Sequence, residues 1–157
     1  MIFVTVGTAR FDPLIAEMDR LVGAGVIRDP VVAQIGRGSY KPKNIRYFRL
    51  LKSLQEAYEH AEIVVSAGGA GTTMECAKRG LPLVVVENTS LMEGHQAQLI
   101  GEMARRGHLI WCKDVMKIAE CIEQARNKQF LPFVSDKPRV HTLIRSLLSK
   151  EKQSHRP

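Results

Sequence analysis

Cysteine is scarce in this chain of 157 residues, and its few copies do not follow a metal-binding or disulfide spacing. The three cysteines are Cys76, Cys112 and Cys121. Their odd number and the lack of any C-x-x-C pair argue against a disulfide framework and against a zinc site. We therefore expect each cysteine to be a small buried hydrophobic side chain in a protein of the reducing cytoplasm.

Long apolar runs and the common nucleotide-binding motifs are missing too. No stretch reaches the ~18 apolar residues of a membrane-spanning helix. The first residues, MIFVTVGT, lack the basic segment of a signal peptide. No GxxxxGK[ST] motif is present, and the Gly36-x-Gly38 pair has no third glycine at the spacing of a dinucleotide-binding fingerprint. These absences exclude a P-loop and give little support to a dinucleotide site.

Positive charge exceeds negative charge, and the excess is concentrated at the C-terminus. The net charge is +7, and the residues from Lys137 onward contribute +5 of it. We expect one domain over residues 1–150 and a flexible basic tail over residues 151–157. A basic end of this kind is either solvated or meets an anionic membrane surface, nucleic acid or an acidic partner.

Short apolar runs alternate with helical patterns along the whole chain. The predicted strands are 2–6, 31–35, 46–48, 63–65, 82–86 and 108–112. The predicted helices are 13–23, a segment with Leu50, Leu51, Leu54, Ala57 and Tyr58 on one face, 72–78, 96–105, 115–127, and a last one with Leu143, Ile144, Leu147 and Leu148. We expect Asp12 to cap the first helix, and Gly80 and Gly107 to end two others. Continuous apolar strands between helices indicate an α/β fold with a doubly wound, Rossmann-like parallel sheet of about six strands.

The stretch SAGGAGTT at 66–73 places three glycines between a strand and a helix. Ordering glycines is entropically costly, so their presence indicates that the backbone must approach something closely. The carboxyl ends of parallel strands are where such sheets bind ligands. A helix that begins there offers amide groups and the positive end of its dipole to an anion. We therefore predict a phosphate or diphosphate site here, the alternative being a tight turn without a ligand.

Two further groups of polar residues fall near the same edge of the sheet. Glu75 lies one turn into the helix that follows the glycines, where it could reach the hydroxyls of a ribose or remain a solvated side chain. A second cluster follows the strand 82–86 and runs from Glu87 to Gln96. In it, His95 and Gln96 open a helix, and their side chains are suited to hydrogen-bond a sugar.

Four segments together give the chain a family resemblance. They are VTVGT with FD, LI and MD after it, QIGRG at 34–38, SAGGAGTTMECAKRGLPLVVVEN at 66–88, and LMEGHQAQL at 91–99. In combination they resemble the C-terminal domain of glycosyltransferase family 28. The resemblance extends to about residue 128, and it includes stand-alone subunits of two-component glycosyltransferases.

The resemblance implies a GT-B donor-binding half-domain and a role for each matched residue. Gly69, Ala70, Gly71, Thr72 and Thr73 would cradle the diphosphate of a UDP-sugar. Glu75 would bind the ribose, and His95 and Gln96 would contact the transferred sugar as the catalytic pair. Gly7 and Thr8 would face the cleft, with Gln34, Gly36 and the surroundings of Phe48 near the uracil. Relatives often carry His or Arg where this chain has Ala67, so backbone amides or Arg37 would have to compensate.

The resemblance further implies an inverting transferase that needs a partner. The chain is too short to hold the acceptor-binding half, so a membrane-anchored partner subunit would bind a polyprenyl-diphosphate-linked saccharide and supply the general base. We expect no cofactor, no metal and no nucleic acid, and a location at the cytoplasmic face of a membrane. The last helix either docks on that partner or packs on its own domain.

Other functions remain open from the sequence. A non-catalytic enhancer of a membrane-associated glycosyltransferase is the main alternative, and Ala67 is the residue that favours it. A self-sufficient enzyme such as a nucleotide-sugar epimerase is a second alternative. The sugar could be N-acetylglucosamine, glucose, galactose or glucuronate, and bacterial polysaccharide assembly is preferred over dolichol chemistry as the setting.

Overall fold

The computed structural model of the chain describes residues 1–88, 94–134 and 144–150. The strands are β1 (Ile2–Thr5), β2 (Val31–Gln34), β3 (Arg46–Phe48), β4 (Ile63–Ser66), β5 (Leu83–Val86) and β6 (Ile110–Cys112). The helices are α1 (Asp12–Gly23), α2 (Gln55–His60), α3 (Ala70–Arg79), α4 (Gly94–Arg105), the 3-10 helix η1 (Val115–Lys117) and α5 (Ile118–Arg126).

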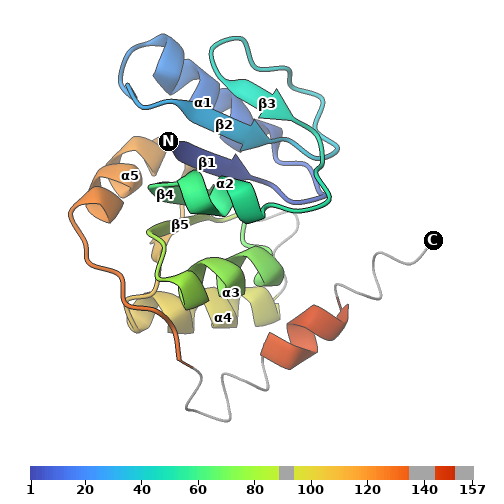
Figure 1. Cartoon of the computed structure of the whole chain (residues 1–157), viewed down its shortest axis with the longest axis vertical. Helices are drawn as coiled ribbons and strands as arrows, with labels where there is room; N and C mark the ends of the chain where they lie inside the picture. The colour runs from blue at the N-terminus through green and yellow to red at the C-terminus, as the bar shows by residue number, and fades with distance from the viewer. Residues whose placement is uncertain (89–93, 135–143, 151–157) are drawn as a thin grey trace.

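The strands form one parallel sheet in the order β3-β2-β1-β4-β5-β6 (Figure 1). β1 lies at the centre, where Thr5 pairs with Gln34 of β2 on one side and with Ser66 of β4 on the other. The predicted doubly wound parallel sheet of six strands is confirmed. Because β1 and β4 are neighbours but are not consecutive, the chain reverses its direction across the sheet between them.

Each face of the sheet has its own hydrophobic core. Successive strand residues point to opposite faces, so Ile2 and Val4 pack with α1 and α5, whereas Phe3 packs with α2, α3 and α4. The connection after β1 therefore covers one face and the connection after β4 covers the other. Doubly wound sheets bind ligands in a crevice where such a change of face occurs, so the carboxyl ends of β1 and β4 are where we expect the crevice of this domain.

The segment after β3 differs from the prediction. Leu50 and Leu51 were expected on the buried face of a helix, but each is 54% exposed and α2 begins only at Gln55. The reason is a contact distant in sequence. The guanidinium Nη1 of Arg49 donates to the carbonyl oxygens of Gly36 (3.1 Å) and Gly38 (2.8 Å) and holds this segment in a non-helical path.

Two smaller expectations about helix ends are also corrected. Asp12 does not cap α1, whose N-cap is Phe11. Its carboxylate accepts the Ser39 amide instead, at 3.1 and 3.2 Å. The helix expected over 115–127 is divided into η1 and α5. Gly80 ends α3 in the left-handed conformation, with φ at +67°, as predicted.

The three cysteines are buried, and one side of the helix at residues 144–150 packs on the core. Cys76, Cys112 and Cys121 are buried as expected, and burial raises the pKa of Cys76 to about 12. Residues 144–150 are helical, and Ile144 and Leu147 pack on the core that contains α3 and α4. Leu143 and residues 151–157 fall outside the described residues. No helix in the described ranges is both long and apolar enough to cross a membrane.

A buried carboxylate in α1 fixes the long connection between β2 and β3. Asp19 is 2% exposed and accepts hydrogen bonds from the Tyr40 hydroxyl (2.7 Å) and from the amides of Lys43 and Asn44 (2.6 Å to Asn44). Burial alone would raise the pKa of Asp19, but these hydrogen bonds outweigh it and leave the pKa below 3.8. The Asp19 side chain thus anchors the connection between β2 and β3, which contains no helix.

Replacing Asp19 should destabilise the fold in a pH-dependent way. Asp19→Asn places an amide donor against backbone donors, so the free energy of unfolding at pH 7 should fall by about 1–3 kcal/mol. A carboxylate whose pKa is lower in the folded state stabilises that state at pH values above the unfolded-state pKa. This stabilisation is lost as the pH falls through the folded-state pKa. The difference between wild type and variant should therefore shrink below about pH 4, which urea denaturation at a series of pH values would measure.

Asp114→Asn serves as the matched control. Asp114 is exposed and accepts the Met116 amide at 2.9 Å, a bond that an asparagine oxygen can also accept. Its stability should stay within about 0.5 kcal/mol of wild type. An Asp19→Asn variant as stable as this control would show that the carboxylate is not the anchor.

Candidate donor-binding site

The two central strands end in the same local structure. Thr5 and Ser66 are opposite each other in register, and both are 1% exposed. The Thr5 Oγ1 accepts the Gly7 amide at 3.0 Å, and the Ser66 Oγ accepts the Gly68 amide at 3.0 Å. Each hydroxyl closes a short turn directly after its strand. The glycines have φ of +65° and +92°, which favours glycine at both positions.

These paired turns direct two loops away from the sheet on either side of the crevice. The Ala67 amide donates to the Thr5 carbonyl at 3.1 Å, so the two loops begin side by side. Gly7 has open space where a Cβ would lie, and Thr8 is exposed. The sequence predicted Gly7 and Thr8 at the cleft, but it gave no role to Thr5 and Ser66. A hydroxyl residue followed two positions later by glycine, at the ends of two strands, is the signal that would have identified them.

The N-terminus of α3 follows the second of these loops. Gly69 is its N-cap, and the first turn contains Ala70, Gly71 and Thr72 and no acidic side chain. Asp12, Glu56 and Glu120 stand in the first turns of α1, α2 and α5, and α4 resembles α3 in having none. A carboxylate in the first turn offsets the positive end of a helix dipole. Within the described residues the dipole of α3 is thus left without this compensation, which favours an external anion.

The two threonines of α3 use their hydroxyl groups inside the protein. Thr73 is fully buried, and both its amide (3.0 Å) and its hydroxyl (2.8 Å) donate to the Gly69 carbonyl. The Thr72 hydroxyl is hydrogen-bonded to the phenol of Tyr58, a bond that opposes the rise in the Tyr58 pKa caused by burial. A diphosphate contact from the Thr73 hydroxyl, as predicted, would need its present bond to break. A contact from the backbone amides of the first turn would leave this hydroxyl bond in place.

Glu75 lies one turn further along α3 and is paired with an arginine of the same helix. Its Oε1 accepts Arg79 Nε at 2.7 Å, and its side chain is 46% exposed. Arg79 also hydrogen-bonds Gln55 and lies over the Tyr58 ring, 5.5 Å from its centroid. The carboxylate is therefore held at a fixed position and remains accessible to solvent. Its predicted role with a ribose stays a prediction.

The strand β5 delivers the other predicted residues to the same edge of the sheet. Asn88 is buried, and its Nδ2 donates to the Arg10 carbonyl at 3.4 Å, which ties the end of β5 to the loop after β1. His95 is exposed and Gln96 half-buried, both in the first turn of α4. The rest of the expected cluster, residues 89–93, falls outside the described residues. His95 and Gln96 thus follow the carboxyl end of β5, and their predicted role with the transferred sugar stays a prediction.

The loop after β2 lies against the loop after β1. Gly36 has φ of +56°, and a Cβ there would come within 2.2 Å of the Ala9 carbonyl oxygen and 2.8 Å of the Gly7 carbonyl oxygen. The Arg37 amide donates to the Ala9 carbonyl at 2.9 Å, so Arg37 sits beside the crevice. Gln34 is buried, and its Oε1 accepts the Thr5 hydroxyl at 2.9 Å. Gln34 therefore holds the Thr5 hydroxyl that closes the turn after β1.

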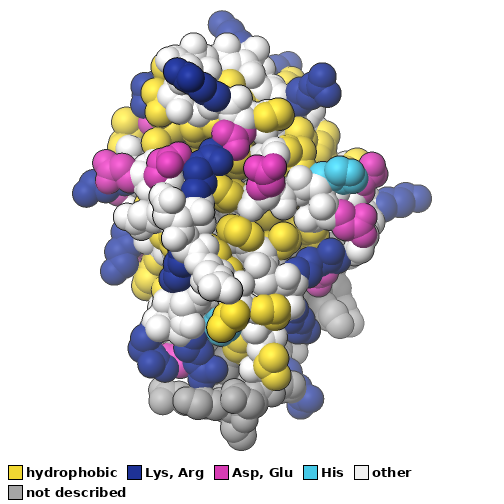
Figure 2. All heavy atoms as spheres, turned by 60° about the vertical axis from the view of Figure 1, so that its left-hand side comes forward, with side chains coloured by type: hydrophobic (Ala, Val, Ile, Leu, Met, Phe, Trp, Pro, Cys, Tyr) yellow, Lys and Arg dark blue, Asp and Glu magenta, His cyan; other side chains and the backbone are white. Residues whose placement is uncertain are grey.

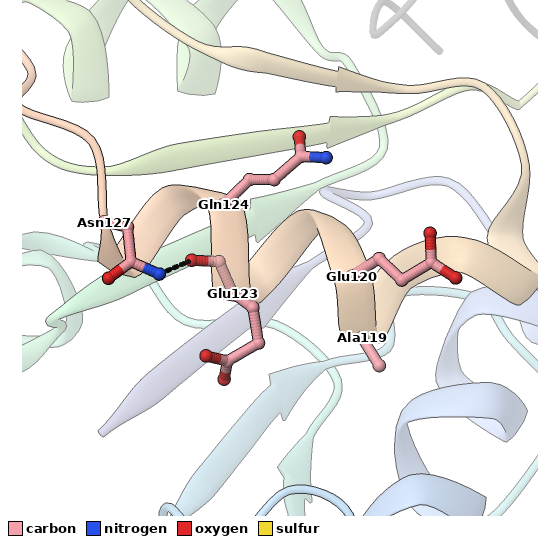
Figure 3. Close-up of a pocket in the computed structure, with 5 residues that line it drawn as sticks. All are labelled: Ala119, Glu120, Glu123, Gln124 and Asn127. Carbon is pink, nitrogen blue, oxygen red and sulfur yellow. Dashed lines mark hydrogen bonds between the residues drawn. The ribbon is translucent and has the colours of Figure 1, made fainter.

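The described residues include no metal centre, and the hollow drawn in Figure 3 does not belong to the crevice. Within those residues no three His, Cys, Asp or Glu side chains lie close enough together to hold an ion. The hollow, of about 650 Å³, is lined by residues of α5 and its C-cap Asn127, among them Glu120 and Glu123 (Figure 3). α5 packs on the same face of the sheet as α1, and two carboxylates would repel a phosphate.

The model of the glycosyltransferase family 28 C-terminal domain matches residues 1–137. The chain belongs to this family. The predicted resemblance is confirmed, and it extends beyond residue 128.

Relatives within the family are subunits of one kind of transferase. The chain is 35% identical over 139 residues to the human "UDP-N-acetylglucosamine transferase subunit ALG13", covering 80% of this chain and 12% of that protein. It is 23% identical over 115 residues to the Candida glabrata protein of the same name, covering 71% of this chain and 57% of the relative. The chain thus corresponds to a small part of the human protein and to more than half of the yeast one.

Solved structures share the fold at low sequence identity. An NMR structure of ALG13 superposes with a TM-score of 0.59 at 18% identity, covering 94% of this chain and 96% of that one. MurG of Acinetobacter baumannii gives 0.58 at 16% identity, covering 94% of this chain and 49% of that one. SnogD of Streptomyces nogalater gives 0.59 at 18% identity, covering 99% of this chain and 40% of that one. The predicted half-domain fold of GT-B glycosyltransferases is confirmed.

Gly36 provides a test of the contact between the two loops. Gly36→Ala forces a side chain against the backbone of Gly7 and Ala9, in addition to the cost of a positive φ. Gly25→Ala, at φ of +74° with open space around it, has that cost alone, roughly 1–2 kcal/mol. Gly36→Ala should destabilise the protein by roughly 2 kcal/mol more than Gly25→Ala, as measured by urea denaturation. Equal losses for the two variants would show that the loops are not in contact.

Proposed function

We infer that this chain is the donor-binding, catalytic subunit of a two-component inverting glycosyltransferase that uses a UDP-sugar. The observation that carries the proposal is the pair of glycine turns at the adjacent ends of β1 and β4, followed by an α3 first turn without an acidic side chain, in a domain of glycosyltransferase family 28. The backbone of Gly69–Thr72 would bind the diphosphate, and Glu75 would bind the ribose. Gly7 and Thr8 would form the opposite wall.

The chemistry of such a site is stabilisation of a leaving group. In the inverting displacement, a hydroxyl of the acceptor attacks the anomeric carbon, and the bond from that carbon to the UDP oxygen breaks. Negative charge then accumulates on the diphosphate, where amides fixed at the N-terminus of α3 stabilise it without rearrangement. His95 and Gln96 would orient the sugar. With this arrangement we expect no metal requirement.

The names of the relatives guide the choice of donor and the need for a partner. They are named as UDP-N-acetylglucosamine transferase subunits, which favours UDP-N-acetylglucosamine over the other donor sugars. The named relatives also favour a role like theirs over the bacterial polysaccharide assembly that we preferred from the sequence. A subunit implies a second chain. We propose that a membrane-anchored partner binds a polyprenyl-diphosphate-linked saccharide, supplies the general base and holds this chain at the cytoplasmic face.

Isothermal titration calorimetry of the purified chain with UDP and UDP-sugars, with and without magnesium, tests the donor site. Binding that does not need magnesium and is tightest for UDP-N-acetylglucosamine is expected. No binding either to the chain alone or to its complex with the partner would favour the non-catalytic enhancer, the reading to which Ala67 lends support.

Gly71→Asp separates donor binding from folding. The change places a carboxylate in the first turn of α3, where it repels a diphosphate but interacts favourably with the helix dipole. UDP binding should be lost, while the midpoint of thermal unfolding stays equal or rises. Gly71→Asn has nearly the same size without the charge and should retain more of the affinity. If Gly71→Asp bound UDP as tightly as wild type, the diphosphate would not lie at this turn.

Glu75 is tested by comparing nucleotides that differ in one hydroxyl. Wild type should prefer UDP to its 2′-deoxy or 3′-deoxy analogue, and Glu75→Ala should weaken UDP binding and abolish that preference. Arg79→Ala is the control, because it removes the ion-pair partner of Glu75 and leaves the carboxylate in place. A preference that survives in Glu75→Ala would remove Glu75 from the site. Both dissociation constants come from the same calorimetric titrations.

A further inference from the structure

A surface outside the donor crevice combines exposed leucines with unpaired cations. Residues 46–52, which we name the basic leucine patch, comprise β3 and the segment after it, with the sequence RYFRLLK. Leu50 and Leu51 are each 54% exposed and Tyr47 is 41% exposed. Arg46, Arg49 and Lys52 are exposed beside them. Large apolar side chains exposed together on an edge strand and its loop are a sign of an interaction surface.

The charge around the patch has one sign. From Pro30 to Gln55 the chain has six Lys and Arg residues and no Asp or Glu. In the described residues, the arginines that form ion pairs are Arg10, Arg20, Arg79, Arg105, Arg106 and Arg126, none of which belongs to this segment. By contrast, the face drawn in Figure 2 has Asp and Glu side chains interspersed with Lys and Arg.

Two carboxylates of α1 contact residues 30–55, and the exposed Glu56 and Glu59 follow that segment in α2 without an ion pair among the described residues. Asp19 is buried beneath residues 40–44, and its carboxylate is engaged by the Tyr40 hydroxyl and by backbone amides. The Asp12 carboxylate accepts the Ser39 amide. Neither carboxylate pairs with a cation of the segment, so the cations keep their charge available to an external anion.

The patch is held in a defined shape. Arg49 bridges to the Gly36 and Gly38 carbonyls, the Gly36 amide donates to the Arg49 carbonyl at 3.1 Å, and Phe48 stacks on Phe3 with ring centroids 6.3 Å apart. Leu50 and Leu51 therefore project from a fixed base. Little conformational entropy would be lost when they are buried against another surface.

We propose that the basic leucine patch docks this protein on an anionic lipid surface. The leucines and Tyr47 would enter the headgroup region, where aliphatic and aromatic side chains gain from leaving water. Arg46 and Lys52 would meet the lipid phosphates and carboxylates, as basic residues beside apolar ones do at membrane interfaces.

The position of the patch relates it to the donor crevice. Leu50 and Leu51 follow the carboxyl end of β3, and the crevice lies at the carboxyl ends of β1 and β4 in the same sheet. Docking would bring the crevice to the membrane surface. This consequence rests on the proposed function, since it matters only if the acceptor is lipid-linked, but docking itself does not depend on it.

Co-sedimentation of the purified chain with vesicles tests the proposal without nucleotide or partner. The chain should bind vesicles of phosphatidylcholine with about 30% phosphatidylserine far more strongly than pure phosphatidylcholine, and added salt should weaken binding. A variant with Leu50→Ser and Leu51→Ser should bind about tenfold or more weakly. That variant keeps every basic residue, including those of the C-terminus. A loss of vesicle affinity in it would therefore locate binding at the leucines.

The matched control is Leu131→Ser, which alters a leucine that is 65% exposed outside the patch. Its vesicle affinity should equal that of wild type. The proposal is overturned if wild type binds neither vesicle, or if the Leu50/Leu51 variant binds like the control. A variant that binds vesicles normally but no longer co-purifies with the partner subunit would assign the patch to a protein contact instead. UDP binding, measured separately, reports on the donor site alone.

Discussion

The architecture of the candidate site depends on the side-by-side pairing of β1 and β4. The two strands end at the same level, and each ends in a buried hydroxyl residue that takes the amide of a glycine two positions on. Because the helices that follow cover opposite faces of the sheet, the two loops diverge at the place where doubly wound sheets bind ligands. The glycine-rich turn, the start of α3 and the path after β1 are all consequences of this pairing.

Electrostatics then distinguishes α3 from the helices that carry their own compensation. In the described residues, α1, α2 and α5 have a carboxylate in the first turn, while the first turns of α3 and α4 have none. The hydroxyls of Thr72 and Thr73 are used within the protein, so the backbone is the main donor available to an anion at α3. Recognition by backbone amides would tolerate side-chain changes nearby, so a donor site at this turn would not depend on the side chain at Ala67.

Much of the fold could be predicted because its signals are local. Apolar runs gave all six strands, Gly80 ended α3, and the glycines at 68–71 pointed to the carboxyl edge of the sheet. The failures have non-local causes. Leu50 and Leu51 have helical spacing with Leu54 and Tyr58, but Arg49 is held by carbonyls more than ten residues away. Asp12 likewise binds Ser39 rather than its own helix, and the roles of Thr5, Ser66 and Gln34 follow from strand order.

The tight packing of Gly36 on the loop after β1 has a consequence for how this domain can diverge. The backbone at positions 7–9 occupies the space that any Cβ at position 36 would need. A descendant that gained a side chain at position 36 would have to reroute the first loop, and hence reshape one wall of the crevice, in the same evolutionary step. The two segments are therefore expected to change together, so that substitutions at position 36 co-occur with altered length or composition at positions 7–9.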